Sequence, residues 1–207
     1  MPDNTCLQVV IYRYRMRKLT TLKNILYSLI GLGILFSGTG STTLANSLAS
    51  VNPPIMLGTY VQGGVTNDTL QQQVVALDQW TGKKSSIVAI TQDFESPTDR
   101  IGTQLDLLWN AGYTPFINLW FNISEPSAYD IAVGTKDAAI TAWAQAINAW
   151  ASSGKWLYIA PLPEMNTSLV SYGRQPINFQ FAYGRILNIF AQNGISDSEV
   201  RWVFAPN

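Results

Sequence analysis

The stretch Trp156-Leu-Tyr-Ile-Ala-Pro-Leu-Pro-Glu164-Met-Asn166 has the pattern of a buried strand that ends in a carboxylic acid and an amide. Its residues are apolar on both strand faces, which is typical of a parallel sheet whose two faces are both covered. A carboxylate at the end of such a strand is costly to desolvate, so an acid at this position is usually there for chemistry. The stretch therefore predicts a parallel sheet and a candidate catalytic acid, Glu164.

Strand-like and helix-like segments alternate on both sides of this stretch. The predicted strands are residues 55–61, 86–92, 114–121, 156–162 and 201–205, and the predicted helices are residues 69–80, 99–110, 135–152 and 179–192. Asp68 is the expected N-cap of the first helix. This alternation predicts βαβ units and an α/β fold with a parallel sheet.

Two architectures fit the alternation: a doubly wound open sheet, and a (β/α)8 TIM barrel that is truncated after about the fifth strand. No Gly-x-Gly-x-x-Gly loop follows the first predicted strand, which counts against a nucleotide-binding open sheet. Polar and aromatic residues gather at the C-terminal ends of the strands, where TIM barrels hold their active sites. These residues are Tyr60, Gln62, Asp93, Asn118, Trp120, Glu164, Asn166, Trp202 and Asn207. The pattern favours the truncated TIM barrel.

The segment Pro161-Leu-Pro-Glu164-Met-Asn166 resembles the acid/base motif of glycoside hydrolase family 26, the endo-β-1,4-mannanase-like family, which reads Arg-Pro-Leu-His-Glu-Met-Asn-Gly. The segment Arg201-Trp-Val-Phe-Ala-Pro-Asn207 is similar to that family's Trp-aromatic-Pro-Asn strand end. Leu57-Gly-Thr-Tyr60 and Trp109-Asn-Ala-Gly-Tyr-Thr-Pro115 are compatible with it. The resemblance covers residues 55–207, the N-terminal part of such a catalytic domain.

The resemblance implies a retaining hydrolase of β-1,4-mannan or related β-glycans, with a polysaccharide as its partner. Glu164 would be the proton donor, which protonates the departing sugar oxygen and then activates water. The nucleophile would be a glutamate on strand seven, outside this chain. The residues that would bind substrate are Asn166, Trp120, Trp202, Asn207 and Tyr60.

The sequence departs from the family motif at four positions. Ala160 replaces its Arg, Pro163 replaces its His, Thr167 replaces its Gly, and Leu169 stands where an aromatic residue usually follows. The isolated chain is therefore expected to be a poor enzyme or none. One alternative is a non-catalytic exported protein, a degenerate hydrolase that binds polysaccharide or an envelope partner. Another is an unrelated α/β binding protein with an open sheet.

Other polar and aromatic residues have structural interpretations. A catalytic role is one interpretation of Asp93 and Glu95, and the favoured one is that they are solvated loop acids that cap the next helix together with Asp99. The tryptophans of the predicted helices are interpreted as packing residues. They are Trp80, Trp109, Trp143 and Trp150. For Trp120, Trp202 and Tyr60, packing and sugar binding are equally good interpretations.

Residues 1–45 are predicted to be a signal peptide. Basic residues from Arg13 to Lys23 precede an apolar run at 25–36, and small residues lead to a cleavage site after Ala45. Met16 begins a more conventional signal and is an alternative start. The apolar run is shorter than the ~20 residues of a membrane span, so no stable span is expected after cleavage, although an uncleaved anchor is the other interpretation. A linker at 46–54 and a secreted, periplasmic or cell-envelope location follow.

Charge and composition exclude several function classes. Residues 46–207 contain 8 Lys and Arg against 12 Asp and Glu, a net charge of −4, which argues against nucleic-acid binding. The chain has no His, and its single cysteine, Cys6, lies in the leader. The usual zinc sites and the Ser-His and Cys-His nucleophile pairs are therefore excluded, and no metal or other cofactor is expected. The sequence does not predict an oligomeric state.

Overall fold

The computed structural model describes residues 9–12, 56–122 and 124–207. The linker at 46–54 and most of the predicted signal peptide lie outside these residues, so both stay predictions. The strands are β1 (Val9–Tyr12), β2 (Met56–Val61), β3 (Ile87–Asp93), β4 (Thr114–Trp120), β5 (Leu157–Pro161) and β6 (Val200–Trp202). The helices are α1 (Asn67–Thr69), the π-helical η1 (Leu70–Val75), α2 (Ala76–Thr81), α3 (Ile101–Asn110), α4 (Ala128–Val133), α5 (Asp137–Ala151) and α6 (Pro176–Gln192).

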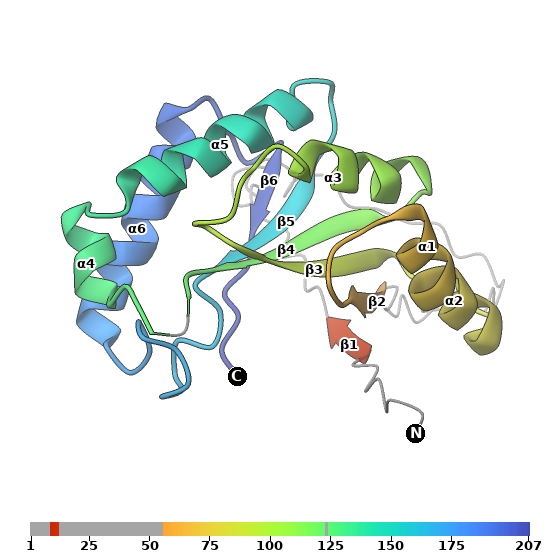
Figure 1. The fold of residues 1–207 in the computed structure, drawn as a ribbon, viewed down its shortest axis with the longest axis horizontal. Helices are drawn as coiled ribbons and strands as arrows, with labels where there is room; N and C mark the ends of the chain where they lie inside the picture. Colours follow the sequence, from red (N-terminus) through yellow and green to blue (C-terminus); the bar gives the residue numbers. More distant parts are fainter. Residues whose placement is uncertain (1–8, 13–55, 123) are drawn as a thin grey trace, which may run out of the picture. The chain divides into compact units, whose positions relative to one another are not determined.

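The described strands form one sheet whose order in space follows the chain, from β1 to β6 (Figure 1). β2 to β6 run parallel, and β1 pairs antiparallel with β2. Sequential parallel neighbours form the wall of a barrel, whereas a doubly wound sheet reverses its strand order at a switch point. The predicted α/β fold with a parallel sheet is thus confirmed, its strand order is that of a barrel wall, and β1 is an additional strand that the sequence pattern did not predict.

The two faces of the sheet belong to different cores. Val88, Ile90 and Ile117 face the main core, which includes residues of α3, α5 and α6. Ile87 and Phe116, on the opposite face, belong to a smaller buried cluster drawn from strands only. Figure 1 shows α3, α5 and α6 on the same side of the strands. A sheet with its helices on one side and a strand-lined interior on the other is the layered arrangement of a barrel wall.

The first helical stretch begins at Thr66, not at the predicted cap Asp68. The Thr66 hydroxyl accepts a hydrogen bond from the Thr69 amide at 3.2 Å, and the Thr66 amide donates to the Thr69 hydroxyl at 2.8 Å. This reciprocal pair satisfies two amides that a helix start leaves free. Asp68 lies in the first turn, where its charge complements the helix dipole.

The short helix α4 was not predicted, because six residues give too little periodicity to recognise. It begins with a capping box in which Ser127 and Asp130 bond each other's backbone amides at 3.3 and 3.0 Å. The Ser127 hydroxyl also donates to the Asp130 carboxylate at 2.6 Å, and this bond, followed by the one from the Ser127 amide, lowers the pKa of the Asp130 carboxyl. Local capping thus fixes a turn of helix that the hydrophobic pattern alone does not show.

Candidate active site at the C-terminal edge of the sheet

The strand register decides which candidate residues lie at one edge. Asp93, the last residue of β3, aligns with Trp120, the last residue of β4, and Glu164 follows the end of β5. Tyr60 aligns with Ala89, four residues before Asp93 along β3. Four strand residues span roughly 13 Å. The structure therefore gathers Asp93, Trp120 and Glu164 at the C-terminal edge and places Tyr60 deeper, against the inner cluster.

Glu164 lies on a tightly held turn after β5. Its backbone adopts a φ of +61°, and that of Leu162 adopts +53°. The Glu164 amide donates to the carbonyl oxygen of Ala205 at 2.8 Å, and its own carbonyl accepts from the amide and hydroxyl of Thr167 at 2.9 and 3.0 Å. Its side chain is half-buried. The predicted acid is thus fixed at the backbone on both sides, between the β5 loop and the segment after β6.

Tyr172 lies within the same loop and was missed by the sequence analysis. It is fully buried, and its hydroxyl donates to the carbonyl oxygen of Pro163 at 3.0 Å. Burial raises the pKa of the Tyr172 phenol, and the negative charges of Glu164 and Asp93 raise it further. Both carboxylates therefore act electrostatically on one phenol. An aromatic residue in a loop rich in Ser, Thr and Gly was its only sequence signal.

Asp93 and Glu95 do not have the predicted capping role. Arg100 is the N-cap of α3, and no side chain caps this helix start. The Asp93 carboxylate accepts from the Glu95 amide at 2.8 Å, and Glu95 forms an ion pair with Lys136. Asp93 is half-buried rather than fully solvated. The capping interpretation is therefore wrong, and Asp93 belongs to the edge that holds Glu164.

Both candidate tryptophan platforms are half-buried and pack in part against the main core. Trp120 is half-buried at the end of β4. Trp202 aligns with Ile159, whose side chain is in the main core, and its ring packs edge-on against Phe190 of α6 at 5.2 Å between centroids. Trp202 therefore faces the helices, away from the strand-lined interior, and packing accounts for its position.

The two candidate asparagines lie together. The side-chain nitrogen of Asn166 donates to the backbone oxygen of Asn207 at 2.8 Å, and the Asn207 amide donates back to the Asn166 side-chain oxygen at 2.9 Å. Both residues are exposed. In this geometry the Asn166 side chain joins two loops, so its amide is engaged by backbone.

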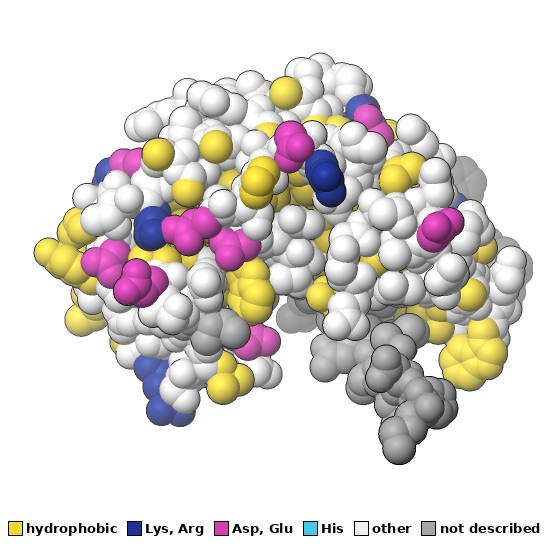
Figure 2. Space-filling model, viewed as in Figure 1, with side chains coloured by type: hydrophobic (Ala, Val, Ile, Leu, Met, Phe, Trp, Pro, Cys, Tyr) yellow, Lys and Arg dark blue, Asp and Glu magenta, His cyan; other side chains and the backbone are white. Residues whose placement is uncertain are grey.

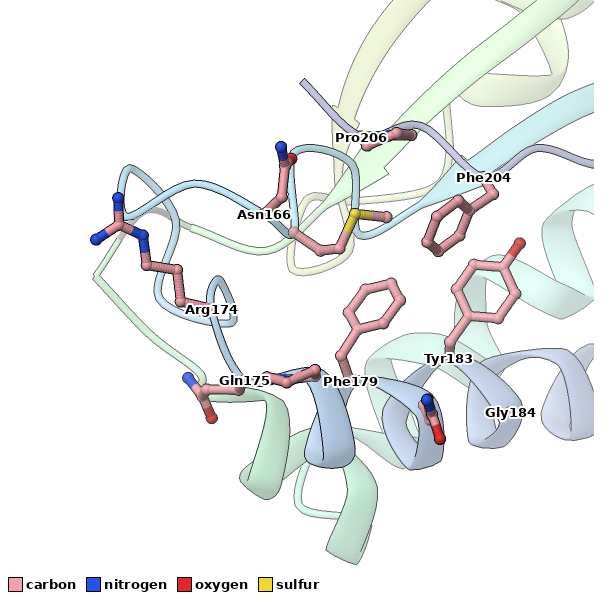
Figure 3. A pocket seen from close by; sticks show the side chains of 11 residues that line it. Asn166, Arg174, Gln175, Phe179, Tyr183, Gly184, Phe204 and Pro206 are labelled. Carbon is pink, nitrogen blue, oxygen red and sulfur yellow. The ribbon is translucent and has the colours of Figure 1, made fainter.

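A pocket of about 690 Å³ lies beside the Glu164 loop. Figure 3 shows Phe179 and Tyr183 of α6 facing Phe204, from the segment after β6. Their ring centroids lie 5.7 to 6.2 Å apart. Met165 also lines the pocket, whereas the Arg174 side chain extends away from the rings (Figure 3). The pocket is therefore walled mainly by apolar groups and adjoins the candidate acid through Met165.

Metal-binding groups, membrane-spanning helices and surface charge are three features that bear on what the protein binds. The described part of the chain holds no group of three or more Cys, Asp or Glu side chains placed to bind a metal ion. None of the helices in residues 56–122 and 124–207 is long and apolar enough to cross a membrane. On the face shown in Figure 2, acidic and basic side chains are interspersed. This face thus presents mixed charge.

Comparison with known proteins links this geometry to a fold. No protein-family model matches the sequence, and no curated protein matches it significantly. The structure is similar to the YdhT protein of Bacillus subtilis and to the B. subtilis mannanases man26 and BCman. Each match has a TM-score of 0.57 and 17% sequence identity over 72% of this chain.

The match covers 56% of the YdhT chain and 55% of each mannanase chain, so the present chain spans a little over half the length of these proteins. Identity at this level reports on fold and not on chemistry. The described residues have the fold of one part of the α/β barrel found in these B. subtilis mannanases.

Proposed function

We propose that this protein is an exported glycoside hydrolase-like protein that acts on β-1,4-mannan or a related β-glycan. The observation that supports this most directly is the position of Glu164. It is a half-buried carboxylate at the C-terminal edge of a barrel wall whose fold is similar to that of two mannanases. This edge is where TIM barrels hold their catalytic residues.

In the proposed reaction Glu164 is the general acid and base. Protonated, it gives its proton to the oxygen of the departing sugar, and ionised, it takes a proton from the water that releases the second sugar. Retention also needs a nucleophilic carboxylate about 5–5.5 Å from the acid, on the other side of the anomeric carbon. We assign that nucleophile to no residue of this chain, because the resemblance places it on strand seven.

The substrate surface in this proposal extends from Glu164 along the strand ends toward Trp120. An aromatic side chain there offers an apolar face to the C–H face of a sugar ring, as aromatic residues with one wet edge commonly do. Trp202 is left out of the proposed surface because it packs against Phe190. Asn166 contributes by fixing the loop, through its two bonds to Asn207.

Release of reducing ends from β-mannan tests the proposal. Activity of the purified chain that Glu164→Gln abolishes would support it, because the amide removes the transferable proton and preserves the shape. Glu125→Gln is the matched control, because this exposed loop glutamate lies after β4, away from Glu164 in sequence. Measurable activity of the unmodified chain that the Glu164→Gln variant retains in full would refute the role of Glu164.

A second candidate function is non-catalytic polysaccharide binding. It is favoured by Pro163 and Ala160, which supply no side-chain hydrogen-bond donor next to Glu164, and Ala160 is fully buried. Retardation of the chain in a mannan-containing gel, without release of reducing ends, would identify this function. Retardation that is equal for the Glu164→Gln variant would agree with it.

A further inference from the structure

The turn that presents Glu164 is unfavourable by itself. Leu162 and Glu164, on either side of Pro163, both adopt positive φ, a region that residues other than glycine rarely occupy. Such conformations persist where the surrounding structure holds them, and they cluster at functional sites. The groups that contact the Pro163 peptide therefore decide where the Glu164 carboxylate points.

Tyr172 supplies one of these contacts from inside the protein. Its side chain is fully buried, and its hydroxyl reaches the Pro163 carbonyl oxygen at 3.0 Å, nine residues away in sequence. The backbone beside it is closely packed: a β-carbon on Gly173 would lie 2.0 Å from the carbonyl oxygen of Thr167. The Arg174 amide also bonds the Met165 carbonyl at 2.8 Å. The backbone on the C-terminal side of Tyr172 is thus fixed by close packing and by a hydrogen bond, which holds the ring in place.

The Tyr172 hydroxyl is a donor at neutral pH, as an ordinary tyrosine phenol is. Burial, then the charges of Glu164 and Asp93, raise the pKa of Tyr172 further above the neutral range. A protonated phenol has one proton to donate, and here it points at Pro163. The same two carboxylates that act on the phenol lie at the strand edge of the candidate site.

We propose that Tyr172 is a positioning residue for Glu164, which fixes the Pro163 carbonyl and thereby the backbone from which the Glu164 carboxylate projects. Its role in a reaction rests on the proposed function. The positioning itself is a property of the folded chain and can be measured without any activity.

Tyr172→Phe tests the proposal, because it removes the hydroxyl and keeps the ring. Tyr113→Phe is the matched control. Tyr113, which directly precedes β4, is also buried, and its hydroxyl donates to the Asp78 carboxylate at 2.9 Å. In the full chain, the Glu164 amide of Tyr172→Phe should exchange its hydrogen roughly five- to tenfold faster, as expected for one lost hydrogen bond. The Ile117 amide reports on global opening. In Tyr172→Phe its exchange should increase less than that of the Glu164 amide, whereas in Tyr113→Phe the Glu164 amide should change no more than the Ile117 amide does.

A spectroscopic signature separates positioning from general stability. The chain has four glutamates, so the 13C signal of the Glu164 carboxyl can be assigned by its loss in Glu164→Gln. This signal should shift in Tyr172→Phe and stay in place in Tyr113→Phe. Incorporation of 4-aminophenylalanine at position 172, which restores an N–H donor at the same point of the ring, should return it toward its original position.

The outcomes distinguish this proposal from the proposed function. A shifted Glu164 signal without mannan hydrolysis by the unmodified chain would support positioning and count against catalysis. If the chain hydrolyses mannan, Tyr172→Phe should lower kcat about tenfold or more with little change in KM, as for a misplaced catalytic group. An unmoved Glu164 signal and unchanged Glu164 amide exchange in folded Tyr172→Phe would overturn the proposal.

If Tyr172→Phe does not fold, the unmodified chain decides. Its Tyr172 hydroxyl proton, which donates to the Pro163 carbonyl oxygen, should then be slow to exchange with water and should show a through-space contact with the Glu164 amide. A Tyr172 hydroxyl that exchanges freely with water would overturn the proposal.

Discussion

Asn166 and Asn207 exchange two hydrogen bonds, of 2.8 and 2.9 Å, between one side-chain amide and one stretch of backbone. The pair joins the loop that holds Glu164 to the segment after β6. The Glu164 amide makes a second link, to the carbonyl of Ala205 in that segment. The candidate acid is therefore anchored to the neighbouring strand end by backbone atoms, and that anchoring can be tested by substitution.

Asn166→Ala should lower the free energy of unfolding by about 1 kcal/mol, because it removes both bonds at an exposed position where water partly replaces them. Urea denaturation of the full chain measures this change. Asn188→Ala, at an exposed position of α6, is the control and should leave stability unchanged or slightly increased, since alanine has the higher helix propensity. Equal stability of the two variants would contradict the structural role of Asn166.

Gly173→Ala should be strongly destabilising, because the new methyl group would meet the Thr167 carbonyl oxygen at 2.0 Å. Backbone must shift to accommodate it, at a cost of about 1–3 kcal/mol. Gly102→Ala, in α3, is the matched control, because a β-carbon there meets nothing within 4 Å and should stabilise the helix by up to about 1 kcal/mol. Thermal unfolding of both variants checks the opposite signs.

The free energy of unfolding should fall in acid, because protonation of the Asp137 carboxylate removes its ion pair with Arg185. Its hydrogen bonds to Arg185, of 2.6 and 2.5 Å, lower the pKa of the Asp137 carboxyl below its ordinary value of 3.8, and the Arg185 charge lowers it further. The pKa of Asp137 is lower in the folded chain than in the unfolded chain. The stability that the Asp137–Arg185 pair contributes is therefore complete above the pKa of the unfolded chain, and it is lost as the pH falls through the pKa of the folded chain.

Urea midpoints at about pH 6 and about pH 2.5 measure this loss. Between these two pH values, the urea midpoint should fall less in Asp137→Asn than in the unmodified chain. Asp197→Asn, at an exposed position between α6 and β6, is the control and should keep the full drop. An equal drop in Asp137→Asn would show that the Arg185 pair contributes nothing to the acid sensitivity.

Trp202→Ala should reduce stability by about 2 kcal/mol, because the half-buried ring loses its contact with Phe190. Trp80→Ala should have almost no effect, since that side chain is 84% exposed. Chemical denaturation distinguishes the Trp202→Ala variant from the Trp80→Ala variant.

If mannan binding is detected, Trp120→Ala should weaken it more than Trp202→Ala does. The reverse result would restore Trp202 as a sugar-binding platform.

Much of the fold could be predicted from the chain because its signals are local. Apolar runs such as Ile87–Asp93 and Thr114–Trp120 were recognised to within a residue or two of their observed ends. The cap at Thr66 and the helix α4 were not, because each depends on one side chain bonding a nearby backbone amide. Hydrophobic periodicity does not report such bonds.

The candidate site could be predicted only in part. Glu164 was found from its strand-end motif, and the register confirms that it lies with Trp120 at the C-terminal edge. Asp93 was expected at this edge but was also given a capping role that it does not have. Tyr172 was missed, because its bond to Pro163 depends on how the loop folds back on itself and leaves no periodic pattern. Trp202 illustrates the same limit: its neighbour Phe190 is in α6, and no local pattern shows which face of β6 it occupies.

The sequence by itself determined the alternation of strands and helices and the position of one acid at a strand end, because both follow from residue order and side-chain type. Only the tertiary structure decided that the strands lie side by side in chain order, that the Asn166 amide binds backbone, and that Tyr172 lies beneath the Glu164 turn. Strand order and the Asn166 bonds join residues far apart in sequence, and the Tyr172 bond depends on how its loop folds back onto Pro163. None of these contacts forms until burial of the apolar core has brought the segments together.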